Sequence, residues 1–374
     1  MKRISTVFVL TSIGAMALLV ANCADESYDE TGGGGTAGTG GTGGSGGEVD
    51  GVAVDISAFD PDGLAEPITE VECTLTNGET STCYQITYNG VPSDHDVGPW
   101  CPTHISDGPE AGGVWLDGGE VYDLDGSFIE NLATFYDDPN WSLFDSETGA
   151  INVTDTQEGC AAAAQPNVPE EWQNYCVECE LSYVDGGISN TVLIPKVPVS
   201  RDTPLELTYD EVGLSLSGVH FNLPAPLANI LGAYTIAAFD DCGGHINLVV
   251  GYHYHTTNGC SREVAQDDGH SPLIGYARDG YGIYGQTNSD GVEPSDLDEC
   301  RGHEDSTRGY HYHVASSGEN LFIGCYHGEV ADDGTTGDQG GELVTCDEVP
   351  AGSPCCGDGV CDGPETTENC GEDC

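Results

Sequence analysis

The sequence predicts a mainly β fold: a large disulfide-braced domain resembling a β-sandwich or barrel, with long Gly-rich loops and few short helices. Short β-branched or alternating runs are separated by Gly, Asp and Asn turns, which is the pattern of strands. The 17 cysteines and 54 glycines among 374 residues are typical of an oxidised domain with large loops. The expected strands lie within 51–59, 84–91, 191–197 and 205–221, and the expected helices within 127–136 and 170–176.

The N-terminal residues predict export. Lys2 and Arg3 precede an apolar run that ends at Ala21, so residues 1–22 are expected to be a signal peptide. The following "LVANC" resembles a bacterial lipoprotein signal that makes Cys23 the lipidated residue, although Asn22 stands where a small residue is usual. The alternative is an ordinary cleaved signal. Removing Cys23 leaves 16 cysteines, an even number that can pair completely.

Three further parts follow the signal. Residues 23–50 hold the lipid-attachment cysteine and a flexible Gly-rich tether, and residues 51–345 are expected to form the β domain. Residues 346–374 form a Cys-rich module with few apolar side chains, so disulfides or an ion must hold it together. Its carboxylates favour calcium, with Asp358, Asp362 and Asp373 as candidate ligands, and a purely covalent knot is the alternative.

The charge excludes one class of function. The formal net charge is −56, and only six basic residues remain after residues 1–22 are removed. Nucleic-acid binding is therefore excluded, because no basic patch is available. We expect an outer-membrane or cell-surface lipoprotein that meets the membrane through its lipid, or alternatively a secreted protein. The sequence does not identify a protein partner.

The spacing of the cysteines supports two further predictions. "ECTLTNGETSTC" predicts a β-hairpin with Asn77-Gly78 at its tip, which would place Cys73 and Cys83 close enough to pair. "CVEC" at 176–179 would suggest redox chemistry or zinc in a cytosolic protein, but in an exported chain it indicates two structural half-cystines.

The most informative feature is an internal duplication within residues 240–328. "CGGHINLVVGYHYH" begins at Cys242, and "CRGHEDSTRGYHYH" begins at Cys300. Both read Cys-x-Gly-His, five further residues and Gly-Tyr-His-Tyr-His. Acidic residues precede each first cysteine, and a second cysteine follows in each copy.

The His-Tyr-His sequences predict a metal site. Alternate side chains of a strand share a face, so His253 and His255 project together, as do His311 and His313. Imidazoles in this arrangement suit zinc or copper. Nine of the 11 histidines lie between 220 and 327, including His270. The alternative is a sheet of half-buried aromatic side chains that binds nothing.

The earlier histidine of each copy depends on local structure. In one straight strand, His245 would lie about 26 Å from His253 and could not share its ion. "HEDSTRG" is turn-like, so a hairpin would bring His303 opposite His311, whereas "INLVV" in the first copy indicates a strand. The sequence therefore predicts a third ligand more strongly in the second copy.

These motifs resemble the bacterial YHYH-domain proteins. "GLSLSGVHF", "HSPLIGYARDGYGIYG", "LDECRGH" and "FIGCYHGE" accompany the two copies in the expected order, and Gly282 stands where a proline is common. The resemblance implies secreted or lipid-anchored bacterial proteins and no particular activity. Within it, Asp279 is a weak candidate for a metal ligand, a partner of a histidine or a general base, and a turn residue is the alternative.

Three functions remain open at this stage. A surface protein that binds zinc or copper ranks first. A metal-dependent extracellular hydrolase or oxidase ranks second, and would place both His-x-His pairs in one cleft beside Asp279. An adhesion or structural protein without metal ranks third. We lean against an enzyme, because the sequence contains no motif for a particular reaction.

Overall fold

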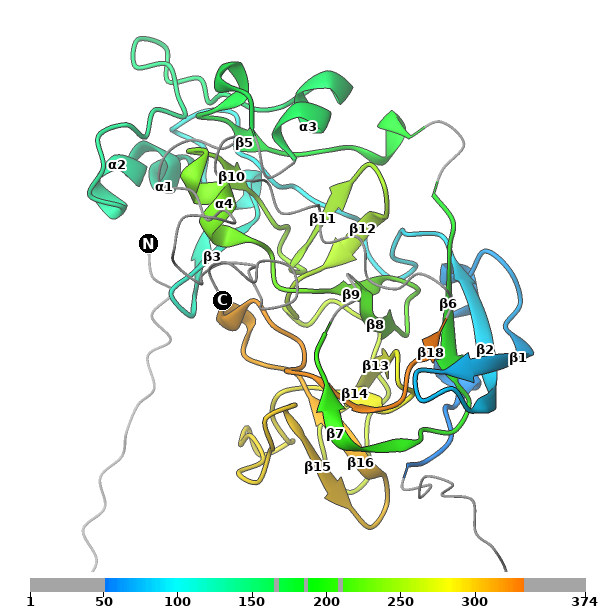
Figure 1. Ribbon diagram of the computed structural model, residues 1–374. Helices are drawn as coiled ribbons and strands as arrows, with labels where there is room; N and C mark the ends of the chain where they lie inside the picture. Colours follow the sequence, from blue (N-terminus) through cyan, green and yellow to red (C-terminus); the bar gives the residue numbers. More distant parts are fainter. Residues whose placement is uncertain (1–50, 165–167, 185–187, 208–210, 333–374) are drawn as a thin grey trace, which may run out of the picture. The chain divides into compact units, whose positions relative to one another are not determined.

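The computed structural model describes residues 51–332, except 165–167, 185–187 and 208–210 (Figure 1). The expected signal peptide, Cys23, the tether and the Cys-rich module with Asp358, Asp362 and Asp373 lie outside the described residues. Within the described part of the chain, no helix has the length and apolar character needed to cross a membrane.

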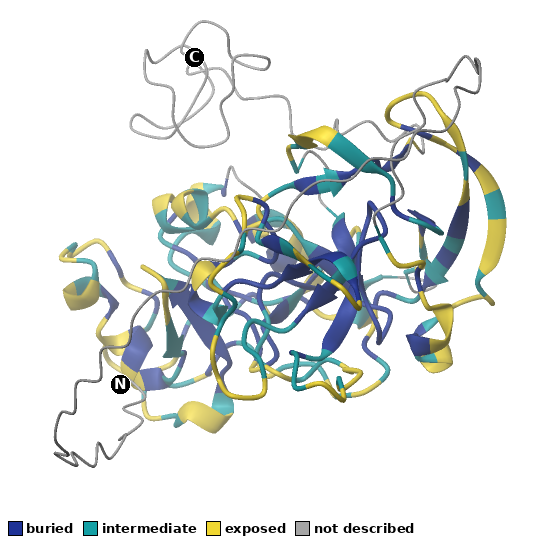
Figure 2. Ribbon diagram, turned by 90° about the horizontal axis from the view of Figure 1, so that it is seen from below, coloured by how far each residue is buried: buried dark blue, intermediate teal, exposed yellow. Residues whose placement is uncertain are grey.

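The centre of the fold is an eight-stranded sheet with the order β11-β12-β9-β8-β13-β14-β16-β15. Most of its residues are buried, and β12 and β13 are buried along their whole length (Figure 2). Its strands are β8 (Glu211–Ser215), β9 (His220–Asn222), β11 (Gly244–Asn247), β12 (Gly251–Tyr254), β13 (Leu273–Ala277), β14 (Gly282–Tyr284), β15 (Gly302–Asp305) and β16 (Gly309–His313).

This sheet consists of two copies of one four-stranded unit. In each copy an antiparallel pair (β8–β9 or β13–β14) is followed by a hairpin (β11–β12 or β15–β16), whose second strand pairs in parallel with β9 or β14. The copies meet through antiparallel pairing of β8 with β13. The duplication therefore extends beyond the histidine motifs and includes the strands on which the hairpins rest.

The hydrogen bonds of the two antiparallel pairs show the same register. The Ser215 amide donates to Val219 at 2.8 Å, and the Ala277 amide donates to Tyr281 at 2.9 Å. Both turns need a positive φ, which is 79° at Gly218 and 88° at Gly280. Residues of these strands thus correspond at an offset of 62, whereas the hairpins correspond at an offset of 58.

The two faces of the sheet carry different side chains. The tyrosines of β12 and β16 lie in one apolar cluster with Phe221 and Ile283. On the opposite face, Leu214 and Tyr276 at the centre pack with a second sheet. The histidines of β12 and β16 share this opposite face, because side chains alternate along a strand. The second sheet packs on the centre of that face, and the histidines lie at its two ends.

That second sheet has four strands in the order β18-β1-β2-β6. Its strands are β1 (Thr69–Leu75), β2 (Thr80–Tyr88), β6 (Asn190–Pro195) and β18 (Ala331–Asp332). Two sheets packed through Tyr84, Ile86 and Val192 confirm the mainly β prediction. The described strands form open sheets and no closed barrel.

A third region, residues 98–183 with 225–239, packs around Trp115 and Phe239. Its strands pair as β3 with β4 and β5 with β10. Its elements are β3 (Val114–Asp117), β4 (Glu120–Asp123), β5 (Cys176–Val177), β10 (Ile236–Ala237), α1 (Gly126–Glu130), α2 (Leu132–Phe135), α3 (Gln157–Ala163) and α4 (Leu227–Gly232). The remaining pair is β7 (Ser200–Leu205) with β17 (Tyr326–Gly328).

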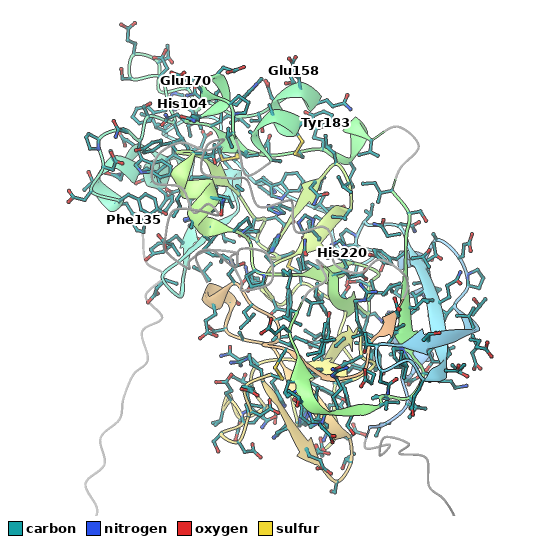
Figure 3. All side chains as sticks on the ribbon, in the orientation of Figure 1. His104, Phe135, Glu158, Glu170, Tyr183 and His220 are labelled. Carbon is teal, nitrogen blue, oxygen red and sulfur yellow. A yellow bond between two sulfur atoms is a disulfide. The ribbon has the colours of Figure 1, made fainter. Side chains whose placement is uncertain are left out.

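Five disulfides brace the described residues (Figure 3). The predicted Cys73–Cys83 pair closes the β1–β2 hairpin, whose Gly78 has a φ of 83°. The half-cystine interpretation of "CVEC" is also confirmed, because Cys176 and Cys179 pair with different partners. The other pairs are Cys101–Cys176, Cys160–Cys179, Cys242–Cys260 and Cys300–Cys325.

The helix and strand predictions were partly wrong. Residues 127–136 form α1 and α2 as predicted, but 170–176 contain only a 3-10 turn, Glu170–Trp172, before β5. The predicted strand at 51–59 is not formed: this segment contains a 3-10 turn, Ile56–Ala58, which the Asp55 carboxylate caps by accepting the Ser57 amide. The helices α3 and α4 were not predicted.

Candidate metal centres

Each histidine motif folds as a β-hairpin that places the early histidine directly opposite the first histidine of its His-Tyr-His sequence. His245 pairs with His253 across β11 and β12, and His303 pairs with His311 across β15 and β16. The hairpin predicted for the second copy is therefore confirmed.

The strand predicted through "INLVV" in the first copy was wrong. β11 ends at Asn247, whose side chain accepts the amides of Val249 and Val250 at 2.9 and 2.7 Å. Gly251 then adopts a φ of 84°, which favours glycine. Asp305 makes the same two contacts in the second copy. In both copies an Asx turn therefore ends the first strand of the hairpin, and in the first copy it does so although the residues that follow Asn247 are apolar.

An aspartate anchors the base of each hairpin; Asp240 is buried, whereas Asp298 is exposed. In the first copy, Asp240 accepts the amides of Cys242 and Gly244 and the hydroxyl of Tyr252. In the second copy, Asp298 accepts the equivalent groups of Cys300, Gly302 and Tyr310. The acid before each cysteine and the first tyrosine of each Tyr-His-Tyr-His thus have structural roles, and they fix the strand that presents the histidines.

The second copy forms a cluster of four histidines, His270, His303, His311 and His313, called the four-histidine cluster below. The Nε2 atom of His311 lies 3.0 Å from the Nε2 atoms of both His270 and His303. The Nε2 atoms of His303 and His313 are 3.2 Å apart. Four ring nitrogens from three segments of the chain therefore converge on one point.

The partners of the other ring nitrogens determine which nitrogens face that point. The Nδ1 atoms of His270, His311 and His313 each lie 2.9 Å from a backbone carbonyl oxygen, to which only an N–H can donate. The Nδ1 atom of His303 lies 2.9 Å from a carboxylate oxygen of Asp296. We assign the proton to Nδ1 in all four rings, so each Nε2 presents a lone pair, as a metal ligand must.

Burial favours the neutral form of three of these rings. Desolvation lowers the pKa of His311 to about 4 and that of His313 to about 3, and it also lowers the pKa of His270. Converging imidazole lone pairs repel one another unless a cation lies between them. The cluster is thus a candidate metal site by geometry and by charge.

The first copy forms a cluster of three histidines, His245, His253 and His255, called the three-histidine cluster below. Its ring centroids lie 4.6–4.9 Å apart, and the equivalent three rings of the second copy lie 4.6–5.3 Å apart. The Nδ1 atoms of His253 and His255 again lie within 3.0 Å of carbonyl oxygens. Desolvation lowers the pKa of His253 to about 4 and that of His255 to about 3.

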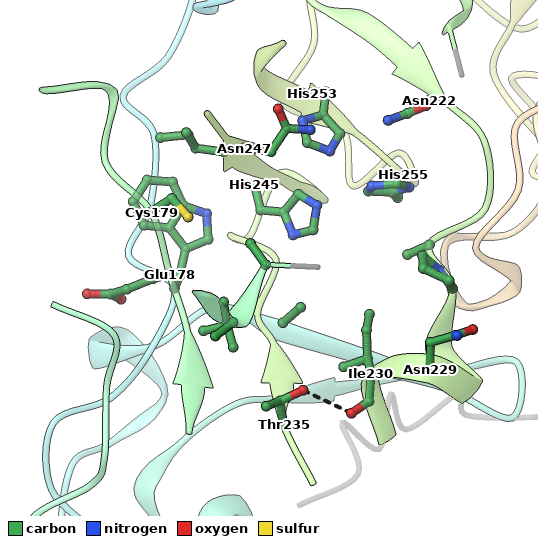
Figure 4. A pocket seen from close by; sticks show the side chains of 18 residues that line it. Glu178, Cys179, Asn222, Asn229, Ile230, Thr235, His245, Asn247, His253 and His255 are labelled. Carbon is green, nitrogen blue, oxygen red and sulfur yellow. Dashed lines mark hydrogen bonds between the residues drawn. The ribbon is translucent and has the colours of Figure 1, made fainter. Parts of the chain in front are cut away.

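The three-histidine cluster faces a cavity of about 370 Å³ (Figure 4). The cavity lies between the sheet, α4 and the strands β5 and β10. The ring of Phe239 packs against the cluster itself, 4.8 Å from that of His245 and 5.5 Å from that of His255. Nothing in the sequence predicted this cavity, because its walls come from segments up to about 150 residues apart.

The two clusters cannot share an ion. Four strands separate β12 from β16 in the sheet, so the clusters lie on the order of 20–25 Å apart at ordinary strand spacing. The single cleft expected of an enzyme that used both His-x-His pairs is not formed. The structure brings together all seven predicted histidines, but in two groups.

Asp279 lies away from both groups. It is fully buried and accepts hydrogen bonds from the Tyr312 hydroxyl and from the amides of Tyr281 and Gly328. Burial raises its pKa to about 6. Because Tyr312 projects to the face opposite His311 and His313, Asp279 orients the strand from behind and contacts no cluster histidine.

Two residues near the clusters were missed by sequence reasoning. His220 is fully buried on β9, with its ring stacked on that of His253 at 5.4 Å (Figure 3). Asp296 orients His303 from an exposed loop. Three arginines of the duplicated region form ion pairs: Arg262 with Asp60, Arg301 with Glu293, and Arg308 with Asp268 and Asp305.

Residues 191–295 match the family model described as YHYH protein. The resemblance read from the sequence is thereby confirmed for this part of the chain. The YHYH match includes the three-histidine cluster and His270, and it ends before His303. No curated protein and no solved structure matches the chain.

Proposed function

We propose that this chain is an exported protein that binds a transition metal, zinc or copper, at both histidine clusters. The observation that supports the proposal most strongly is the convergence of four unprotonated Nε2 atoms in the four-histidine cluster. Because the ring nitrogens that face outward are tied to carbonyls and to Asp296, the site is preorganised to receive an ion with only small shifts of the rings.

The distances suit both metals. Zinc–nitrogen bonds of 2.0–2.1 Å give ligand separations of about 3.3–3.4 Å in a tetrahedron. The same bond length gives separations of about 2.8–2.9 Å along the sides of a square-planar site of the kind that Cu²⁺ prefers. The Nε2 separations of 3.0, 3.0 and 3.2 Å lie between these values.

The test is the metal content of the full chain, produced in an oxidising compartment without a histidine tag and dialysed against Zn²⁺ or Cu²⁺. We expect two ions per chain, and one ion in each of the variants His253→Gln/His255→Gln and His311→Gln/His313→Gln. His104→Gln is the matched control, because His104 belongs to neither cluster. A chain that retains neither metal would overturn the proposal.

Export and anchoring are part of the same proposal. The odd number of cysteines and the five disulfides of the described residues support an oxidising compartment and a separate role for Cys23. Cys23→Ser should move the protein from the membrane fraction to the soluble fraction of the producing bacterium. Equal membrane association of both forms would exclude lipid anchoring at Cys23. Calcium binding by Asp358, Asp362 and Asp373 remains a proposal for the C-terminal module.

A metal-dependent enzyme is the second candidate. The observation that favours it is the cavity in front of the three-histidine cluster, because catalytic zinc sites commonly use three protein ligands and leave a position open. An adhesion protein without metal is less favoured, because the cluster imidazoles are directed inward and are mostly buried.

A further inference from the structure

The duplication allows the two clusters to be compared ligand by ligand. His245, His253 and His255 correspond to His303, His311 and His313 in register and ring spacing, and the Nδ1 atoms of His253 and His311 contact equivalent glycine carbonyls. The contact of His303 with the Asp296 carboxylate occurs in the second copy alone among the described residues. The fourth ligand of the second cluster, His270, comes from outside the hairpin, three residues before β13. The number of histidine ligands therefore differs through this one position.

The first copy has no histidine at that position. At the offset of 62 found for the paired strands, the sequence position that corresponds to His270 is Thr208, which lies outside the described residues. Threonine is not among the usual ligands of zinc or copper. Within the described residues, the group around His245 contains three ligands and the group around His303 contains four.

The described residues around the first cluster leave a cavity beside it. The imidazoles of His245, His253 and His255 form one wall of the cavity, and Asn229, Ile230 and Thr235 lie across from them (Figure 4). The volume of about 370 Å³ falls within the range of small-molecule sites. In the four-histidine cluster, the ring of Tyr284 packs 4.9 and 5.0 Å from those of His270 and His311. The pocket on the outer side of this cluster is lined by His270 alone of the four histidines, whereas all three histidines of the first cluster line its cavity.

We propose that the three-histidine cluster is an open metal site, and that the ion there binds a small ligand from the cavity through its remaining coordination position. This inference presupposes the metal binding proposed above. Closed sites with four protein ligands are typically structural, whereas sites with three protein ligands exchange water for a substrate or inhibitor. The two copies thus contain one metal site that stabilises the fold and one that binds an external ligand.

The cavity walls define the class of that ligand. Among the described residues that line the cavity there is no lysine or arginine and one acid, Glu178, which accepts the Cys101 amide at 3.2 Å. Apolar walls alternate with the amide groups of Asn222, Asn229 and Asn247. A polyphosphate or another multiply charged anion would find no counter-charge beyond the ion itself. The walls fit a neutral or singly charged molecule with an apolar body and one oxygen or nitrogen donor.

The experiment uses the full chain loaded with Co²⁺, whose visible spectrum reports its coordination, and acetohydroxamate as the probe. We expect saturable spectral changes from about half of the bound cobalt. The variant His253→Gln/His255→Gln should lose the response together with one cobalt ion. Ala237→Phe should lose the response and keep both ions, because Ala237 lines the cavity and a phenyl ring would fill it.

A second variant tests the role of the fourth ligand. His270→Ala should make the four-histidine cluster resemble the first, so that the probe then affects nearly all of the bound cobalt. Two cobalt ions with no response to saturating acetohydroxamate would overturn the open site and leave the proposed metal binding intact. A response that survives His253→Gln/His255→Gln would also overturn it. A chain that binds no cobalt, zinc or copper would instead overturn the proposed function.

Discussion

Removing two ligands from the four-histidine cluster should abolish the stabilisation that metal provides there. His311 is the ligand to change, because its Nε2 contacts those of both His270 and His303, and His313 completes the pair on β16. Glutamine at both positions preserves most of the side-chain volume, so the comparison tests the metal rather than the packing.

The magnitude follows from linkage. An ion that binds only the folded state stabilises it by about 4.1 kcal/mol at a free concentration 1,000 times its dissociation constant. For a domain of this size, 1 kcal/mol moves Tm by about 2 °C, so saturation of one cluster should raise Tm by about 8 °C. The wild-type protein should gain this amount at each cluster.

The assay is thermal unfolding by circular dichroism, with and without Zn²⁺ or Cu²⁺, each variant being compared with its own metal-free form. His311→Gln/His313→Gln should lose about 8 °C of the metal-dependent shift, and His104→Gln should lose none. The reasoning would be refuted if the double variant kept the full wild-type shift.

Three further predictions concern the metal-free protein, the hairpins and the disulfides. Four cluster histidines have a pKa of about 3 or 4 in the folded protein, so below pH 6.5 they bind protons in the unfolded chain and not in the folded one. Asp279, whose folded pKa is about 6, has the opposite effect on stability. Chemical denaturation of the metal-free protein should therefore show that the free energy of unfolding falls by up to about 4 kcal/mol per pH unit from pH 6 to pH 5, and a flat profile would contradict this prediction. Asp305→Ala removes the acceptor for two turn amides and should cost about 1–2 kcal/mol in urea unfolding, a loss that Asp305→Asn should largely avoid. Cys242→Ser/Cys260→Ser opens a loop of 18 residues and should cost about 3 kcal/mol; an unchanged urea midpoint would count against a stabilising role.

The sequence predicted what local patterns encode. Alternation placed His253 with His255 and His311 with His313, and the Asn77-Gly78 turn predicted the β1–β2 hairpin. The turn of the first copy was not predicted because the residues between Asn247 and Gly251 are apolar. Asn247 and Gly251 themselves indicated a turn, since Asp305 and Gly309 occupy the same positions in the second copy.

Strand order explains the rest of what was missed. The sequence shows two similar hairpins, but it does not show that β9, β8, β13 and β14 lie between them and keep the clusters apart. The cavity depends on α4 and β10 packing over the first hairpin, a long-range contact that no short pattern encodes. His270 joins the second cluster only because β14 pairs in parallel with β16.

The most direct measurement is anomalous X-ray diffraction at the zinc or copper absorption edge from crystals of the metal-loaded chain. The account predicts one peak about 2 Å from the Nε2 atoms of the four-histidine cluster and a second peak at the three-histidine cluster. Crystals grown with saturating metal that show ordered, converging imidazoles and no anomalous peak between them would contradict it.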